Sequence, residues 1–161
     1  FSAAGRLLNR QGGNEMFIKQ LSVIIENKKG ALADWAALMA KNNIDLIAST
    51  LVDTGEMGTL RAVVSDAGTA LELLRKANYA VTSTDVFAIP LFDHPGALAE
   101  LLELLRANNI CVEYLYSFMR PLEGDGVVVI RTNLPGATCA LFEEQKIPML
   151  SEAQLRAKKE K

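Results

Sequence analysis

An internal repeat constrains the fold of this chain more than any other feature of its sequence. The fifteen residues that begin at Gly30 align with the fifteen that begin at Gly96, and eight of the aligned positions are identical. The identities include the starting glycine and the closing Asn-Asn-Ile triplet. The offset of 66 residues is longer than a solenoid unit and matches a minimal two-layer domain. The chain is therefore expected to be a duplicated domain.

The residue pattern of the first half predicts four strands and two helices. Strand-like runs cover 21–26, 46–53, 60–64 and 81–84, and helical periodicity covers 31–41 and 69–77. Trp35 belongs to the apolar stripe of the first helix, so it is expected in the core. Asn42-Asn43 is expected to end that helix, because asparagine tolerates the left-handed conformation. Ser65 or Asp66 can cap the second helix.

The second half repeats this order. Strands are expected at 86–92, 112–119, 127–131 and 148–150, helices at 97–107 and 136–145, and a turn at 121–125. Each half thus has the order βαββαβ, with two helices on one face of an antiparallel sheet. The predicted fold class is α+β, built from two tandem ferredoxin-like domains.

The expected domain organisation has four parts. They are a non-native or disordered leader (1–15), a first domain (16–84), a second domain (85–155) and a charged tail (156–161). The chain is expected to fray after Ser151. The leader is rich in Gly, Asn, Arg and Gln, and Met16 opens the regular pattern. Two origins of the leader stay open, a translated ribosome-binding site around Gln11-Gly12-Gly13 and a fusion scar.

Composition excludes several classes of function. The net charge of −2 gives no basic excess for a nucleic-acid partner, and no apolar run reaches the roughly 18 residues of a membrane span. Cys111 and Cys139 have no CxxC spacing, which favours free, buried thiols in the cytoplasm. The single histidine, His94, cannot supply a histidine-rich metal site, so no metal and no cofactor is expected.

Motifs of catalysis are also missing from the sequence. There is no GxSxG elbow, no Walker loop and no GxGxxG after a strand. The predicted central strands are aliphatic, whereas an RNA-binding domain of this shape stacks bases on aromatic side chains. The protein is therefore expected not to be an enzyme. A small enzyme for an amino-acid-like substrate, dependent on Asp93 or His94, stays open as an alternative.

The loop between the first strand and the first helix of each half is the candidate binding site. It covers 26–32 in the first half and 92–98 in the second. Gly30 and Gly96 allow a close approach to the backbone. The N–H groups at the start of the next helix favour a carboxylate. The side-chain oxygen of Asn27 or Asp93 can accept a hydrogen bond from an α-ammonium group, so the loop suits both ends of an amino acid.

The succession of strand, [Asn/Asp]-x-x-Gly-Ala-Leu, helix and Asn-Asn-Ile resembles the ACT domain. This regulatory module occurs on phosphoglycerate dehydrogenase, aspartate kinase and other enzymes of amino-acid metabolism. The similarity covers nearly all of 17–155, twice over, and also extends to free-standing bacterial proteins that consist of two ACT domains.

The resemblance implies a set of ligand-binding positions at domain or subunit interfaces. They are Asn27, Gly30, Ala31, Leu32 and Asp45 in the first half, and Asp93, Gly96, Ala97, Leu98 and Cys111 in the second; His94 lies in the same loop and would make binding pH-sensitive. The family often has asparagine where Asp45 and Cys111 stand, and Lys28-Lys29 replaces the more usual x-Pro.

Several of these residues also have a purely structural interpretation. Asn27 and Asp93 can cap a helix or form a turn, and His94 can be an exposed loop residue. An alternating aromatic set, Tyr114, Tyr116 and Phe118, shares one sheet face. This set is expected to pack against the other domain or a second subunit, with a ligand pocket as the minority interpretation.

The leading hypothesis is an amino-acid-binding sensor or regulator without catalytic activity. Its expected partners are a small-molecule ligand, a second copy in a homodimer, and a metabolic enzyme. The alternative is a ligand-independent interaction module that regulates a separately encoded metabolic enzyme.

Overall fold

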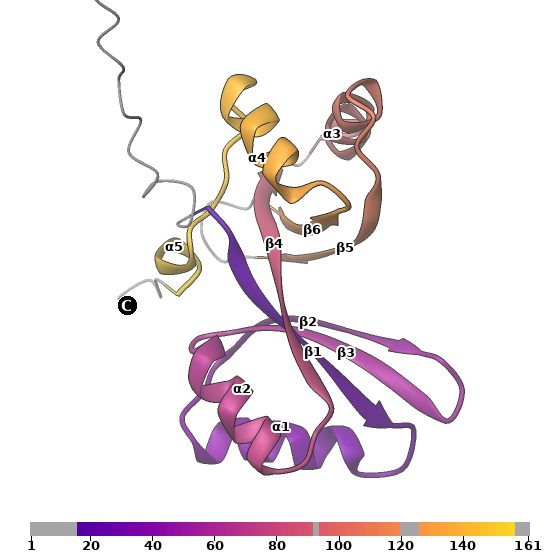
Figure 1. Cartoon of the computed structure of the whole chain (residues 1–161), viewed down its shortest axis with the longest axis vertical. Helices are drawn as coiled ribbons and strands as arrows, with labels where there is room; N and C mark the ends of the chain where they lie inside the picture. Colours follow the sequence, from indigo (N-terminus) through magenta and orange to yellow (C-terminus); the bar gives the residue numbers. More distant parts are fainter. Residues whose placement is uncertain (1–15, 92–93, 120–125, 157–161) are drawn as a thin grey trace, which may run out of the picture.

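The computed structural model describes residues 16–91, 94–119 and 126–156 of the chain. Its helices and strands follow the predicted duplicated order (Figure 1). The first half contains β1 (Ile18–Glu26), α1 (Ala31–Lys41), β2 (Leu46–Asp53), β3 (Met57–Val64), α2 (Ala67–Lys76) and the start of β4 (Val81–Leu91). The second half contains α3 (Ala97–Ala107), β5 (Val112–Met119), β6 (Gly126–Thr132), α4 (Pro135–Glu144) and the short α5 (Glu152–Arg156).

The strands form one antiparallel sheet in the order β2-β3-β1-β4-β6-β5. The predicted class, two tandem ferredoxin-like units with helices on one face of each sheet, is confirmed. In the first half, α1 and α2 bury their apolar faces on β1 and β3 in one core, to which Trp35 and Met39 contribute. In the second half, α3 buries Leu101 and Leu105 at the equivalent positions, and these pack into a separate core with α4.

One strand, β4, serves both halves. Residues 81–86 pair with β1, and residues 87–91 pair with β6. The sequence pattern predicted two strands here, 81–84 and 86–92, and that expectation was wrong. No glycine and no proline lies between Val81 and Ile89, so nothing in this stretch of β4 interrupts the extended backbone. The domain boundary expected between 84 and 85 falls inside this strand, and the division stays a prediction.

The strand expected at 148–150 is absent from the described part of the second half. Pro148 has no backbone N–H to donate to a neighbouring strand, which explains why a regular ladder does not form. A single backbone hydrogen bond holds this segment to the sheet, from Leu150 N to Ala88 O at 2.9 Å.

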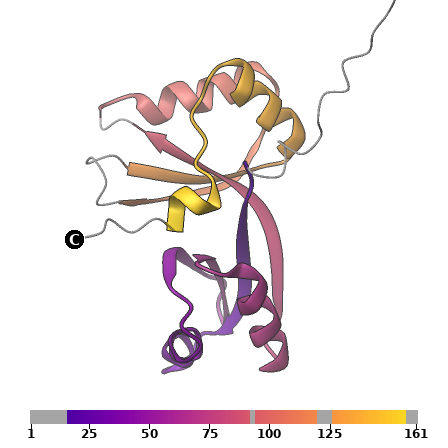
Figure 2. The ribbon, with the colours of Figure 1, turned by 90° about the vertical axis from the view of Figure 1, so that its left-hand side faces the viewer.

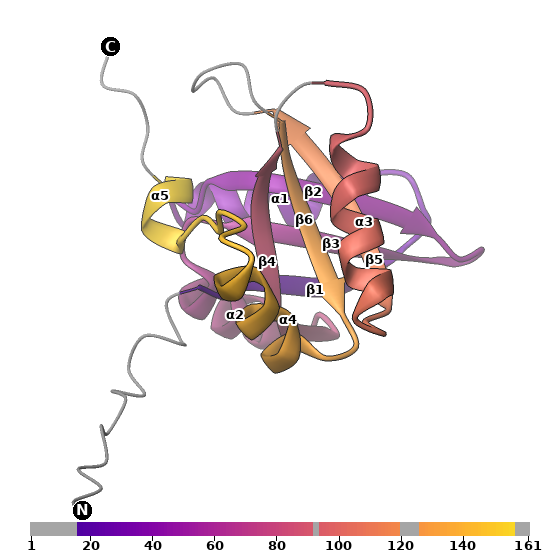
Figure 3. The ribbon, with the colours of Figure 1, turned by 90° about the horizontal axis from the view of Figure 1, so that it is seen from above.

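The two half-sheets pack face to face, with α1 and α2 on one outer side and α3 and α4 on the other (Figure 2). The third core lies between them and includes Ile18 and Val63 of the first half and Tyr116 and Val129 of the second. Seen from above, the strands of the second half cross those of the first (Figure 3). The sheet face that each ferredoxin-like unit leaves bare is therefore covered by the other unit.

The segment after Ser151, expected to fray, instead forms α5. Leu155 is buried in the core between the half-sheets, and the Glu152 carboxylate accepts a hydrogen bond from Lys19 N at 3.1 Å. Residues 157–161, like the leader 1–15 and the turn 121–125, lie outside the described residues. No helix in the described part of the chain is long and apolar enough to cross a membrane.

Candidate functional site

The loop at residues 27–30, here named the Gly30 loop, joins β1 to α1. Its backbone turns tightly: Lys28 N donates to Glu26 O at 2.9 Å, and Ala31 N donates to Lys28 O at 3.2 Å. Gly30 is the N-cap of α1 with φ 90°, a left-handed conformation that glycine adopts at no steric cost. A side chain built there would meet nothing within 4 Å, so the backbone conformation, and not crowding, selects glycine.

Asn27 connects this loop to the β2–β3 hairpin. Its Nδ2 donates to Gly55 O at 3.0 Å and to Asp53 Oδ1 at 3.3 Å, and its backbone N donates to Glu56 O at 2.9 Å. The helix cap is Gly30, so the capping interpretation of Asn27 is wrong, and its side chain bonds the hairpin and not the local turn. Because the amide nitrogen is committed to the hairpin, a ligand at this position would meet the carbonyl oxygen Oδ1.

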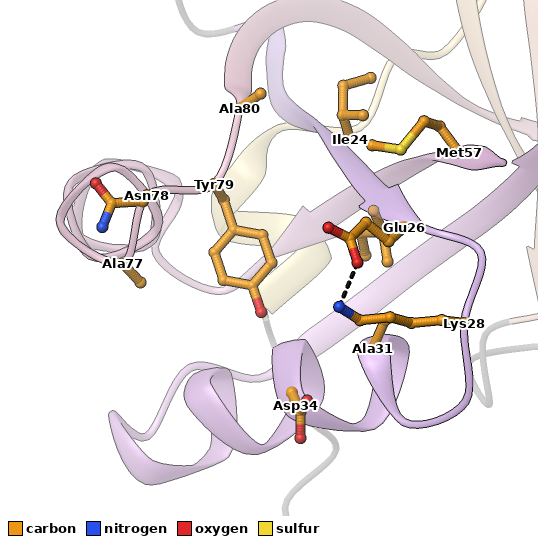
Figure 4. A pocket seen from close by; sticks show the side chains of 11 residues that line it. Ile24, Glu26, Lys28, Ala31, Asp34, Met57, Ala77, Asn78, Tyr79 and Ala80 are labelled. Atoms are coloured by element: carbon orange, nitrogen blue, oxygen red, sulfur yellow. Dashed lines mark ion pairs between the residues drawn. The ribbon is translucent and has the colours of Figure 1, made fainter.

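Two pockets flank the Gly30 loop. The hairpin-side pocket has a volume of about 170 Å³ and lies between the loop and the hairpin, where Asn27, Leu32, Leu51 and Asp53 line it. The Tyr79 pocket has a volume of about 340 Å³ and lies on the other flank, between the end of β1, the first turn of α1 and the α2–β4 connection (Figure 4). The larger volume falls within the range of small-molecule sites.

The charged groups beside the loop are partly paired with each other. Lys28 Nζ forms an ion pair with the Glu26 carboxylate, drawn in Figure 4. The hydrogen bond to Glu26 and the negative charge of Glu26 raise the pKa of the Lys28 ammonium, with a smaller contribution from Asp34. Lys28 therefore stays positively charged at neutral pH while it borders both pockets.

The loop before α3, here named the Gly96 loop, repeats this backbone with different side chains. Gly96 is the N-cap with φ 103°, and Ala97 N donates to His94 O at 3.3 Å. His94 is exposed, as its structural interpretation predicted, and its Nδ1 lies 3.1 Å from Pro95 O. Ala97 and Leu98 begin α3 and are half-buried. Asp93, the proposed contact for an ammonium group, lies outside the described residues.

Asp45 and Cys111 lie away from the Gly loop of their own half. Asp45 precedes β2, at the far end of α1 from Gly30, a separation of about 16 Å for an 11-residue helix. The Asp45 backbone is hydrogen-bonded to Ser65 there, and Cys111 is joined to Asn133 in the same way. A ligand that contacts Gly30 and Asp45 together would need them from different domains or subunits.

Cys111 is exposed, so the expectation that both cysteines are buried was wrong for this residue. It precedes β5 at the surface, where its backbone, and not its thiol, makes the hydrogen bonds to Asn133. Cys139 is buried, as expected, and this burial raises the pKa of its thiol.

The alternating aromatic residues of β5 face the other half, as predicted. Tyr116 Oη donates to Gln20 Oε1 at 2.9 Å, and Gln20 Nε2 donates to Tyr114 Oη at 2.8 Å. Gln20 is fully buried, so this polar bridge joins β1 of the first half to β5 of the second inside an apolar core. The Arg61 guanidinium lies 4.0 Å from the centre of the Tyr114 ring, a cation–π contact.

Sequence reasoning missed the residues that complete the surroundings of the Gly30 loop. Asp53 and the Gly55 turn reach the loop because antiparallel strands bring the β2–β3 hairpin to the end of β1. Tyr79 lies in the α2–β4 connection. It reaches the same end of the domain because β4 is also antiparallel to β1, so the start of β4 lies beside the end of β1. The strand order would have placed both at this end of the domain, but no motif in the sequence marks them.

The fold and its paired Gly loops define a class, a tandem of ferredoxin-like domains joined through a shared strand. The sequence model of the ACT domain pair matches residues 16–158. The chain belongs to this family.

Solved structures agree with this assignment. The chain is similar to protein BT0572 from Bacteroides thetaiotaomicron, with 37% identity, 88% of this chain and 97% of that chain covered, and a TM-score of 0.83. It shares its fold with the regulatory subunit of aspartate kinase from Thermus thermophilus, at 16% identity, 78% and 90% coverage and a TM-score of 0.54. The subunit from Thermus flavus gives 18% identity, 78% and 90% coverage and a TM-score of 0.55. No curated protein matches the chain.

Proposed function

We propose that this protein is a non-catalytic regulator that binds an amino acid at its Gly loops, close to a domain or subunit interface. One observation carries the proposal: the Gly30 loop is flanked by pockets and presents groups that suit both ends of an amino acid. Membership of the ACT domain pair family supports it. The described residues contain no cluster of His, Cys, Asp and Glu side chains able to hold a metal ion, and the proposal needs none.

The chemistry of the loop accounts for both charged ends of such a ligand. The first-turn amides of α1, at Leu32 and Ala33, precede the first residue whose N–H has an acceptor within the helix. Together with the helix dipole they favour a carboxylate. Asn27 Oδ1 would accept from the α-ammonium group. The Gly96 loop offers equivalent amides, with Ala97 and Leu98 at the start of α3 and Asp93 in the place of Asn27.

Regulation would follow from the way the halves are joined. A ligand at the Gly30 loop contacts the end of β1, and β1 pairs with β4, which continues into the second half. Binding can therefore favour one orientation of the halves, or of two subunits, and report the ligand concentration as a coupling free energy. Asp45 and Cys111 would contribute from a neighbouring domain or subunit. The protein would act in the cytoplasm, on an enzyme of amino-acid metabolism.

A thermal-shift panel of the twenty amino acids at millimolar concentration tests the proposal. A ligand at a hundred times its Kd adds about 2.7 kcal/mol to the free energy of unfolding. For a protein of this size that raises the melting midpoint by roughly 5–10 °C. We expect one or two amino acids to produce such a rise. A panel in which none of the twenty moves the midpoint would contradict the proposal.

Matched asparagine variants show whether the rise comes from the Gly30 loop. Asn27 and Asn42 are both exposed and lie at opposite ends of α1, where the Asn42 side chain donates to Leu38 O at 2.8 Å. Asn27→Ala is expected to abolish the ligand-induced rise, whereas Asn42→Ala should retain it. Equal retention in both variants would remove Asn27 from the site.

The outer strand β2 supports the second candidate function, an interaction module that works without a ligand. β2 pairs with β3 on one side, and its other edge ends the sheet. Leu51 and Val52 on this edge strand are 48% and 44% exposed. The unpaired N–H and C=O groups of such an edge strand can pair with a further strand, either of a second copy or of a partner enzyme. We therefore propose β2 as the dimer or enzyme contact.

Sedimentation of the wild type and of Leu51→Lys tests this contact. A homodimer through β2 predicts a dimeric wild type and a monomeric variant. A wild-type monomer that nevertheless captures its enzyme with no amino acid present would favour the second candidate function over the first.

A further inference from the structure

The Tyr79 pocket contains chemistry that the proposed amino-acid contacts of the Gly loop do not use. It opens beside the first turn of α1, on the opposite flank of the Gly30 loop from the hairpin-side pocket. In Figure 4 the Tyr79 ring projects between the two helices, and its hydroxyl is directed toward α1. Among the described residues this hydroxyl has no hydrogen-bond partner. It is therefore available to a bound molecule.

The charges around this pocket do not balance. Glu26 and Lys28 neutralise each other in an ion pair. Asp34, which also lines the pocket, forms no ion pair with any residue that the structure describes. One negative charge is left over, and the Tyr79 ring adds a π face of the kind that attracts cations. The pocket is therefore suited to a positively charged group.

The remaining wall of the pocket is apolar. Ile24 and Met57 line it from neighbouring strands, and each is 39% exposed, although both are large aliphatic side chains. In Figure 4 the two side chains lie next to each other, above the Glu26–Lys28 pair. An alkyl chain laid on this wall would remove apolar surface from water, which is favourable.

We propose that the Tyr79 pocket binds an alkylammonium ligand, with its ammonium group between Asp34 and Tyr79 and its alkyl chain on Ile24 and Met57. The alkylammonium group can belong to the side chain of a basic amino acid or to a diamine. This site is separate from the amino-acid contacts of the Gly30 loop, and it can bind its ligand whether or not that loop binds one.

The second half does not reproduce this chemistry. The backbone places Ile147 where the first half has Tyr79: Tyr79 N donates to Leu74 O, and Ile147 N donates to Phe142 O. His94 stands in the place of Lys28, and Glu100 in the place of Asp34. Without a phenol, the equivalent position has no ring and no hydroxyl for a cation, so the proposed site belongs to the first half alone.

Calorimetric titration of the full chain with three compounds tests the proposal. L-lysine and putrescine both carry an alkylammonium group, whereas L-norleucine has the aliphatic chain of lysine without it. We expect L-lysine or putrescine, or both, to bind at millimolar concentration. Comparison of the two titrations shows whether the ligand is a basic amino acid or a diamine. Norleucine should bind at least about tenfold more weakly, because the charged hydrogen bonds are lost. Norleucine binding as tight as that of lysine would overturn the proposal, and so would no binding of either cation.

Two variants locate the binding site. Asp34→Asn should weaken binding by about tenfold or more, while Glu100→Gln, the same change at the equivalent position of α3, should leave it unchanged. Both residues are exposed, so neither change is expected to disturb folding. Tyr79→Phe removes the hydroxyl but keeps the aromatic ring, and it should weaken binding less than Asp34→Asn. Unaltered affinity in Asp34→Asn would contradict the proposed site, whatever the result for the Asn27 variant at the Gly30 loop.

Discussion

The Gly30 and Gly96 loops begin equivalent helices with nearly the same backbone. The two glycines have φ angles of 90° and 103°, and the C-cap of each helix is followed by an asparagine with φ 56°, Asn43 in one half and Asn109 in the other. The two helices bury the same positions, with Trp35 in α1 standing where α3 has Leu101. The duplication has kept the features that shape the backbone.

The side chains around the two loops differ far more than their backbones do. The first half places Lys28 and Tyr79 beside its loop, where the second half has His94 and Ile147. Fold and binding chemistry are carried by different residues, so two copies of one fold need not bind the same molecule. The two copies are nevertheless joined by β4, the strand that belongs to both halves.

A core substitution in the second half gives the largest expected effect and tests whether the halves act as one unit. Leu101→Ala removes a side chain that is 4% exposed and should lower the free energy of unfolding by about 2–5 kcal/mol. The chain has a single tryptophan, Trp35, which lies in the other half. If the shared β4 makes unfolding cooperative, Trp35 fluorescence and far-UV circular dichroism will shift together in urea.

The control for this experiment is Leu134→Ala, at an exposed leucine, which should change stability by at most about 0.5 kcal/mol. An unchanged fluorescence transition in Leu101→Ala, with a biphasic dichroism curve, would show that the halves unfold independently.

The polar bridge between the halves gives the next largest effect. Tyr116→Phe leaves the buried Gln20 Oε1 without its donor and should cost about 1–3 kcal/mol in urea unfolding. Tyr79→Phe is the matched control, because the Tyr79 hydroxyl donates to no described residue, and it should change stability by at most about 0.5 kcal/mol. Similar losses in both variants would argue against the bridge.

The same variant alters the pH dependence of stability. Burial raises the pKa of the Tyr116 hydroxyl in the folded state, with a smaller contribution from Tyr114. The stabilisation from the protonated hydroxyl is complete below the ordinary tyrosine pKa of about 10 and is lost as the pH rises above it. Wild-type stability should therefore fall more steeply above pH ~10 than that of Tyr116→Phe. Parallel curves would contradict this assignment.

The glycines of the two loops should respond equally. Gly30→Ala and Gly96→Ala each place a Cβ in a left-handed conformation, at a cost of about 1–2 kcal/mol. Gly136→Ala, inside helix α4, is the control and should stabilise the protein by up to about 1 kcal/mol. A loss at only one of the two loops, measured by urea unfolding, would show that their backbones are not equivalent.

The smallest effect is predicted for a substitution that gives α4 of the second half the N-cap residue of α2 in the first half. In α2 the Asp66 carboxylate accepts from Thr69 N at 3.0 Å, whereas the N-cap of α4 is Leu134, whose side chain has no oxygen to accept with. Leu134→Asp should raise stability by about 0.5–1 kcal/mol at neutral pH.

The pKa of Asp66 shows how this gain should depend on pH. The Thr69 amide lowers the pKa of Asp66, and the same geometry in α4 would make the gain disappear as the pH falls through the lowered pKa. If Leu134→Asp brings no gain in stability at neutral pH, measured by thermal unfolding, the N-terminal turns of α2 and α4 differ in backbone geometry.

The sequence was sufficient for the fold wherever local patterns repeat. Gly30 with Gly96, and Asn43 with Asn109, revealed the helix ends of both halves because each residue type is tied to a backbone conformation. The shared β4 was not predictable from pattern alone, since an apolar stretch does not record which strand it pairs with. The loss of the strand at Pro148 had a visible cause in the proline, which sequence reasoning did not weigh.

The candidate site was only partly predictable. The Gly30 loop could be located because its motif is local, and the facing of Tyr114 and Tyr116 toward the other half followed from their alternation. Asp53 and Tyr79 could not be found in this way, because they reach the loop from distant segments through strand order. Asp45 lies at the other end of α1 from Gly30 in the same half, so its predicted contact with a ligand at the Gly30 loop requires a neighbouring domain or subunit.

Amide chemical shifts measured during titration with each of the twenty amino acids test the central claim most directly. If an amino acid binds at the Gly30 loop, the backbone amides of Asn27, Gly30, Ala31 and Leu32 will move together and saturate at one Kd. Helix α1 beyond its first turn should move little, because its amides are already bonded within the helix. A result in which all twenty amino acids leave these four amides in place would contradict the account.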